Sequence, residues 1–83
     1  MNIKIHNPSN VEINNLISSY KSGKFNEALK LAKILTQKYP SHQFSWKILG
    51  ALLGITGKTK EALYANNKAV NLLPKDFEAQ NNL

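Results

Sequence analysis

Hydrophobic residues recur with helical spacing through most of the chain. The first apolar stripe has the i, i+3, i+4, i+7 pattern and consists of Ile13, Leu16, Ile17 and Tyr20. The second consists of Ala28, Leu29, Ala32, Leu35 and Tyr39. Two further helices are predicted over residues 44–55 and 60–73. Because no stretch alternates with a period of two residues, we expect no β-strands.

Residues that begin or end helices stand at the boundaries of these stripes. Ser9 and Glu12 have the spacing of a capping box before the first helix. Gly23 can close that helix in a left-handed conformation, and Pro40 stops the second. Gly57 and Pro74 follow the third and fourth helices. Asp76 is suited to cap a fifth helix that begins at residue 77.

The chain repeats itself at an offset of 34 residues. Five of seven positions are identical between residues 23–29 (GKFNEAL) and residues 57–63 (GKTKEAL). Pro40 and Pro74 share that offset, and so do Leu49 and Leu83. Each unit reads as a pair of helices joined by a tight turn.

One stretch of the chain resembles the tetratricopeptide repeat, a family of 34-residue helical hairpins. The resemblance is carried by Trp46, Leu49, Gly50, Leu53, Ala62, Ala69 and Pro74. Leu53 replaces the usual aromatic residue, and Asn66 stands where Phe or Tyr is more common. The small residues Gly50 and Ala62 are expected where the two helices of a unit cross. Trp46 and Leu49 are expected to fill the space between units.

The resemblance implies an all-α fold of antiparallel helix-turn-helix repeats, stacked as a short right-handed solenoid. It divides the chain into an N-terminal tail (1–8), a degenerate first unit (9–42), a full unit (43–76) and the start of a further helix (77–83). An array normally needs about three units. We therefore expect an N-terminal piece of a longer protein, whose exposed apolar end could mediate self-association.

The function that the resemblance implies is protein–protein interaction, with a peptide or partner protein bound in the concave groove. The first helix of each unit lines that groove in the family. The expected contact residues are Asn14, Ile17, Lys21, Lys47, Ala51, Ile55, Asn81 and Asn82. Each of them also fits an ordinary exposed helix position. The alternative is a non-catalytic, substrate-presenting arm of a bacterial glycosyltransferase or sulfotransferase, since such arrays precede transferase domains.

Composition argues against chemistry within these 83 residues. The absence of cysteine excludes disulfides, thiolate metal sites and a cysteine nucleophile. His6 and His42 lack further ligands at useful spacing, so we expect no metal and no cofactor. Glu27 and Glu61 occupy equivalent positions at the starts of helices, where the helix dipole favours an acid, and a catalytic pair is the less favoured interpretation. No serine shows a nucleophile-elbow pattern with a histidine–acid pair, so we expect no enzyme.

The net charge of +6 has two interpretations. Most of the eleven lysines lie on or beside the second helix of each unit, which is the outer face in this family. A nucleic-acid or acidic-lipid surface is one interpretation. Arginine is absent, and few aromatic residues stand among the lysines, so a solvated lysine-rich face is favoured and no nucleic-acid partner is expected.

Targeting and membrane signals are absent from the sequence. The N-terminus has no apolar run of signal-peptide length. The longest nearly continuous apolar stretch, residues 48–55, is far shorter than the roughly 20 residues of a membrane-spanning helix. We expect a cytoplasmic location without membrane contact.

Overall fold

Four α-helices and no strand make up residues 7–73, the part of the chain that the computed structural model describes. The helices are α1 (Asn10–Lys21), α2 (Phe25–Lys38), α3 (Gln43–Ile55) and α4 (Thr59–Asn71). All four helices were predicted from the sequence, and the bounds predicted for the third and fourth differ from the observed ones by at most two residues. The fifth helix predicted from residue 77 lies outside the described residues.

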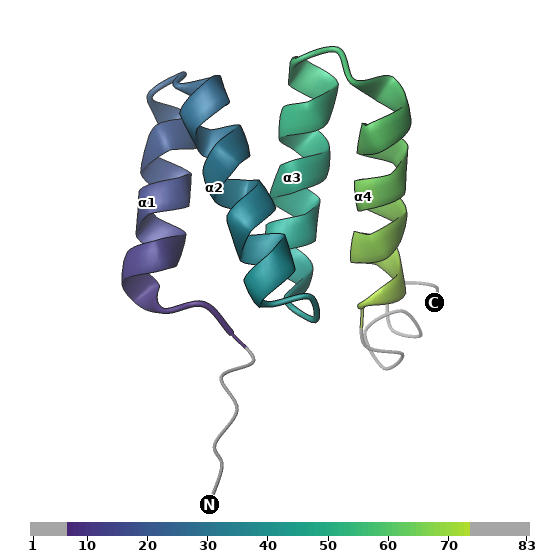
Figure 1. Cartoon of the computed structure of the whole chain (residues 1–83), viewed down its shortest axis with the longest axis horizontal. Helices are drawn as coiled ribbons and strands as arrows, with labels where there is room; N and C mark the ends of the chain where they lie inside the picture. The colour runs from purple at the N-terminus through teal and green to yellow at the C-terminus, as the bar shows by residue number, and fades with distance from the viewer. Residues whose placement is uncertain (1–6, 74–83) are drawn as a thin grey trace, which may run out of the picture.

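The helices stand in a row in chain order, and each runs antiparallel to the one before it (Figure 1). Packing contacts join α1 to α2, α2 to α3 and α3 to α4. Within residues 7–73, the backbones of α1 and α3 do not contact each other. Because each turn reverses the chain, α1 and α3 run in the same direction, and so do α2 and α4.

Local signals fix the helix ends as the sequence predicts. The Ser9 hydroxyl accepts the backbone N–H of Glu12 at 3.1 Å, and the Glu12 carboxylate accepts the N–H of Ser9 at 2.8 Å, which completes the capping box. Gly23 and Gly57 have φ angles of +77° and +81°, a conformation that a Cβ atom disfavours. The last residue of α2 is Lys38, two positions before Pro40.

The core runs along the row of helices and is built from leucine and alanine. Leu16 of α1 and Leu52 of α3 are completely buried. Ala28 and Ala32 of α2 and Ala65 of α4 are also 0% exposed. Alanines at these positions bury apolar surface while adding little bulk between adjacent helices.

Gly50 lies at a close approach of α3 and α4, as predicted for a small residue. An added Cβ atom on Gly50 would lie 2.8 Å from Cγ and 3.3 Å from the backbone nitrogen of Asn66. Ala62, the other predicted small residue, is buried at 7% exposure. The pair Gly50 and Asn66 therefore sets how closely the two helices pack.

Trp46 and Leu49, predicted to fill the space between the units, are half-buried and buried, respectively, on α3. Leu49 is buried at 6% exposure in the core. The indole N–H of Trp46 donates to the carbonyl of Pro40 at 2.9 Å, which does connect it to the preceding unit. Its ring, however, meets the ring of Tyr64 edge-on at a centroid distance of 6.0 Å. Since Tyr64 belongs to α4, the half-buried indole packs largely within its own unit.

Candidate ligand groove

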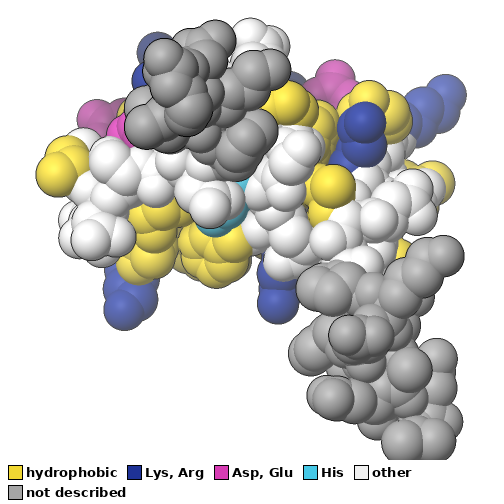
Figure 2. Space-filling view, turned by 90° about the horizontal axis from the view of Figure 1, so that it is seen from below, with side chains coloured by type: hydrophobic (Ala, Val, Ile, Leu, Met, Phe, Trp, Pro, Cys, Tyr) yellow, Lys and Arg dark blue, Asp and Glu magenta, His cyan; other side chains and the backbone are white. Residues whose placement is uncertain are grey.

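A pocket of about 350 Å³ opens between α1 and α3. It is lined by Ile17, Tyr20, Lys21, Phe44 and Ile48. The four apolar or aromatic side chains are half-buried, whereas Lys21 is exposed. Figure 2 shows hydrophobic side chains gathered between two lysines along the lower edge of the view. The pocket is thus an apolar groove with an ammonium group at its margin.

The groove exists because α2 holds two parallel helices apart. α2 packs against both α1 and α3, whose backbones do not contact each other in the described part of the chain. Ile17 and Lys21 are four residues apart on α1, and Phe44 and Ile48 are four apart on α3. Residues at this spacing lie on one face of a helix, so each helix contributes one continuous wall.

The sequence predicted two of the five lining residues, Ile17 and Lys21. Tyr20 was assigned only to the apolar stripe of the first helix, and Phe44 and Ile48 were missed. Asn14, Lys47, Ala51 and Ile55 are on α1 and α3 as expected but do not line the groove. Asn14, Lys47 and Ile55 are exposed, and Ala51 is half-buried. Asn81 and Asn82 lie outside the described residues.

His42 caps α3 beside the groove residue Phe44. Its Nδ1 accepts the backbone N–H of Ser45 at 3.3 Å and lies 2.7 Å from the Ser45 hydroxyl. The imidazole also packs edge-on against the ring of Phe44, with centroids 6.2 Å apart. Burial lowers the pKa of His42, which favours the neutral ring that this acceptor role requires. The cap therefore fixes the start of the α3 wall.

The sequence missed this contact between a histidine and a serine. The pattern that reveals it is local, because an N-cap side chain meets the third residue of the helix. Ser45 is 0% exposed, and no acidic group is seen on His42 in residues 7–73. The pair has the geometry of a helix cap, with its hydroxyl out of reach of a substrate.

Glu12 ties α1 to the end of α2. Its carboxylate accepts hydrogen bonds from the Tyr39 hydroxyl at 2.9 Å and from the Lys38 ammonium at 2.9 Å, in addition to the N–H of Ser9. The hydrogen bond from the Ser9 backbone, followed by those from Lys38 and Tyr39, lowers the pKa of Glu12 to about 2. Hydrogen bonding to Glu12 raises the pKa values of Lys38 and Tyr39. This network positions the α1 wall of the groove.

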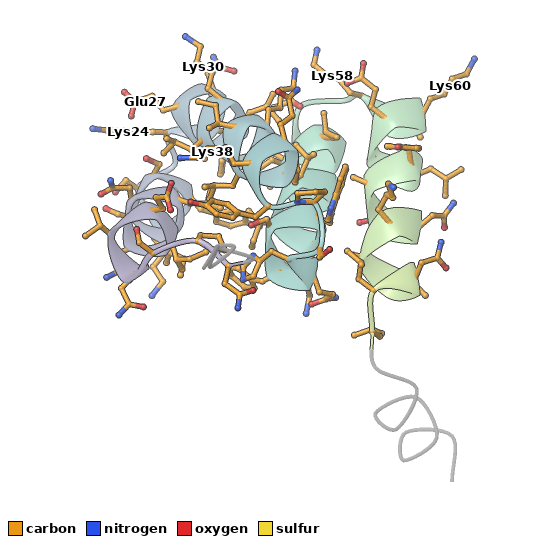
Figure 3. The ribbon with its side chains drawn as sticks, turned by 60° about the horizontal axis from the view of Figure 1, so that its bottom comes forward. Lys24, Glu27, Lys30, Lys38, Lys58 and Lys60 are labelled. Atoms are coloured by element: carbon orange, nitrogen blue, oxygen red, sulfur yellow. The ribbon has the colours of Figure 1, made fainter. Side chains whose placement is uncertain are left out.

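Several exposed lysines lie on or beside α2 and α4. Figure 3 shows Lys24 and Lys30 at the start of α2, with Glu27 nearby, and Lys58 and Lys60 at the start of α4. All are exposed. Lys38 is paired with Glu12, and Lys68 lies 5.5 Å from the centre of the Trp46 ring. These lysines lie on or beside α2 and α4, the two helices on which the sequence concentrates lysine.

Residues 7–73 show neither a cluster of metal ligands nor a helix of membrane-spanning character. No three side chains of His, Asp or Glu gather there in a way that could hold a metal ion. None of the four described helices has the length and apolar character needed to cross a bilayer.

No known protein family, curated protein or solved structure matches the chain.

Proposed function

We propose that the chain is a tetratricopeptide-like repeat module that binds an extended peptide in the groove between α1 and α3. In this proposal the α1–α2 and α3–α4 hairpins are successive units of a right-handed solenoid. α1 and α3 line its concave side. The observation that carries the proposal is the apolar pocket of about 350 Å³ between two parallel helices whose backbones stay apart.

The lining residues indicate the chemistry of the ligand. Ile17, Phe44 and Ile48 offer apolar surface to a leucine or similar side chain. The volume is at the lower end of the range of about 300–1,000 Å³ for ligand pockets, which suits one or two side chains of a peptide. Lys21 offers an ammonium group to a neighbouring carboxylate. We therefore expect a peptide that alternates apolar and acidic residues.

Fluorescence anisotropy with two labelled peptides tests the proposal. One peptide alternates leucine with glutamate, and the other alternates leucine with lysine. The leucine–glutamate peptide should bind more tightly. Lys21→Glu should weaken its binding about two- to five-fold, as expected for an exposed ion pair, and should favour the leucine–lysine peptide.

Lys47→Glu is the matched control because Lys47 is an exposed lysine of α3 that does not line the groove. It changes the net charge as Lys21→Glu does, so a general charge effect would appear in both variants. Ile48→Ser should weaken the binding of both peptides, because it removes apolar surface from the groove. Equal effects of the two lysine variants, or binding that survives replacement of every leucine by alanine, would refute the groove as the site.

A further inference from the structure

Each wall of the groove carries an aromatic ring that a second ring holds in place. Tyr20 lines the groove from α1, and Phe44 lines it from α3. The Tyr20 ring meets the ring of Phe25 in α2 edge-on, with centroids 6.0 Å apart. The Phe44 ring meets the imidazole of His42 edge-on, with centroids 6.2 Å apart. Both groove rings are thus held by contacts within the chain, so that a ligand need not order them.

The lining of the groove is poor in hydrogen-bond acceptors. Three of its five residues have no polar side-chain atom, namely Ile17, Phe44 and Ile48. The Lys21 ammonium only donates, and the Tyr20 hydroxyl is the single side-chain oxygen among the five. Main-chain carbonyls within the two helices are occupied by helical hydrogen bonds, and that of Tyr20 accepts the N–H of Gly23 at 3.1 Å. A peptide in the groove therefore meets donors for its carbonyls but almost no acceptor for its N–H groups.

Proline is the residue whose chemistry fits this lining. It is apolar, it has no main-chain N–H, and its carbonyl can accept from the Lys21 ammonium or the Tyr20 hydroxyl. A leucine has similar apolar surface but brings an N–H, and burying a donor without a partner is costly. Proline-rich segments also hold a polyproline II conformation before they bind, and they dock on aromatic side chains in several kinds of recognition module.

We propose that the groove binds a peptide segment in which proline stands next to glutamate or aspartate, with a proline ring between Tyr20 and Phe44 and the acid beside Lys21. The inference rests on the proposed function, because it names the ligand of the same groove. It narrows the apolar residue of the ligand from leucine or a similar side chain to proline.

Charge supports the acidic neighbour of the proline. Residues 7–73 contain nine lysines and three glutamates. Glu12 is paired with Lys38, and no other ion pair is seen in this part of the chain. Lys21 is exposed at the margin of the groove. An acidic peptide is therefore attracted by the protein as a whole and meets an ammonium group at the groove itself.

Fluorescence anisotropy with two labelled peptides of equal charge tests the proposal on the full chain. One peptide alternates leucine with glutamate, and the other alternates proline with glutamate. The proline–glutamate peptide should bind about five- to ten-fold more tightly, which is the lower part of the range expected when a buried N–H lacks a partner. Tyr20→Leu and Phe44→Leu should each remove most of this preference. Tyr64→Leu is the matched control, since Tyr64 is 60% exposed on α4 and does not line the groove.

NMR of the bound peptide provides a readout that needs no variant. Protons of a proline seated against aromatic rings should shift upfield in the complex, because of the ring currents. Circular dichroism verifies that each variant keeps its helices.

Leucine–glutamate binding that equals or exceeds proline–glutamate binding would overturn this inference and leave the proposed function intact. Proline signals that do not move in the complex would also overturn it, as would a Tyr64→Leu variant that loses the preference to the same extent as Tyr20→Leu. If neither peptide binds, the proposed function fails and this inference fails with it.

Discussion

Gly50 lies against Asn66 with no room for even a methyl group between α3 and α4. A Cβ atom at position 50 would be 2.8 Å from Cγ of Asn66 and 3.3 Å from its backbone nitrogen. The Asn66 side chain can rotate away, but the backbone of α4 cannot move without disturbing the buried Ala65 and Ala69 beside it. The side chain of Asn66 is therefore the main obstacle to a methyl group at position 50.

We expect Gly50→Ala to lower the free energy of unfolding by about 1 kcal/mol. Overpacking lowers the free energy of unfolding by about 1–3 kcal/mol, whereas replacing glycine by alanine within a helix raises it by about 1 kcal/mol. In an Asn66→Ala background, the same substitution should instead stabilise the protein. Gly54→Ala is the control, since nothing lies within 4 Å of a Cβ atom there, and it should stabilise by about 0.5–1 kcal/mol. Urea unfolding of Gly50→Ala, Asn66→Ala, their combination and Gly54→Ala measures these changes. Equal gains in stability for Gly50→Ala and Gly54→Ala would contradict the packing argument.

Protonation of Glu12 should lower the stability of the fold at acidic pH. Its pKa falls from 4.5 to about 2 on folding, so its contribution is present above pH 4.5 and is lost as the pH falls towards 2. Glu12→Gln should lower Tm at pH 6, and the difference from the unmodified chain should vanish near pH 2. Glu27→Gln, at an exposed position in the first turn of α2, serves as the control. A Tm difference for Glu12→Gln that stays constant from pH 6 to pH 2 would contradict the role of the ionised carboxylate.

His42 should make stability depend on pH in a second, higher range. Burial lowers its pKa below 6.5, so folding favours the neutral ring. The stability it provides is present above pH 6.5 and is lost as the pH falls through the lowered pKa. Protonation also places a positive charge at the N-terminus of α3, where the helix dipole disfavours it.

Replacement of His42 tests this dependence directly. His42→Asp keeps an acceptor at the N-cap and removes the titration, so Tm should become flat between pH 8 and pH 5. His42→Ala should cost about 0.5–2 kcal/mol at pH 8, the usual loss for an N-cap. His6→Gln controls for the other histidine. If the slope between pH 8 and pH 5 disappears in His6→Gln and persists in His42→Asp, the assignment to the α3 cap is wrong.

Ala62 should tolerate no larger side chain. It is 7% exposed at the start of α4, in the same core cluster as Leu49 and Leu53 of α3. Ala62→Leu should therefore cost about 1–3 kcal/mol through overpacking. Asn67→Leu, at an exposed position on the same helix, should change the free energy of unfolding by less than about 0.5 kcal/mol. Unfolding curves that coincide for these two variants would show that the core around position 62 accommodates a leucine side chain without overpacking.

Local patterns were sufficient to predict the helices. The capping box of Ser9 and Glu12, the glycines at 23 and 57, and Pro40 act within a few residues of the ends that they define. Such signals depend only on neighbours in the sequence, so the ends of the third and fourth helices were predicted to within one or two residues.

The groove could be predicted only in part because it depends on how α3 is rotated relative to α1. Ile17 and Lys21 follow from the stripe of one helix. Phe44 and Ile48 face the same space only because α2 separates and orients both helices. The first unit lacks the tryptophan and the Leu-Gly pair of the second, so equivalent positions in the two units do not face the groove equally.

The sequence could not predict the contacts of Glu12 with Lys38 and Tyr39, because they also depend on how two helices pack. Lys38 and Tyr39 are 26 and 27 residues away from it, and no periodic pattern connects them. The carboxylate had an adequate local role in the capping box, so nothing in the sequence indicated further partners. Contacts between helix ends depend on the packing angle, which the pattern of one helix does not define.

Within residues 7–73, each helix packs only against the helices next to it in the sequence, and this has a consequence for how the chain folds. Since α1 touches α2, α2 touches α3 and α3 touches α4, helix contacts join elements that follow each other directly in the sequence. Short-range contacts of this kind belong to fast folders, with rates in the microsecond to millisecond range. They also let an end helix detach alone. Opening of α1 would break the Glu12 network and one wall of the groove while α3 and α4 stay paired, so amide hydrogens of α1 should exchange sooner than those of α3.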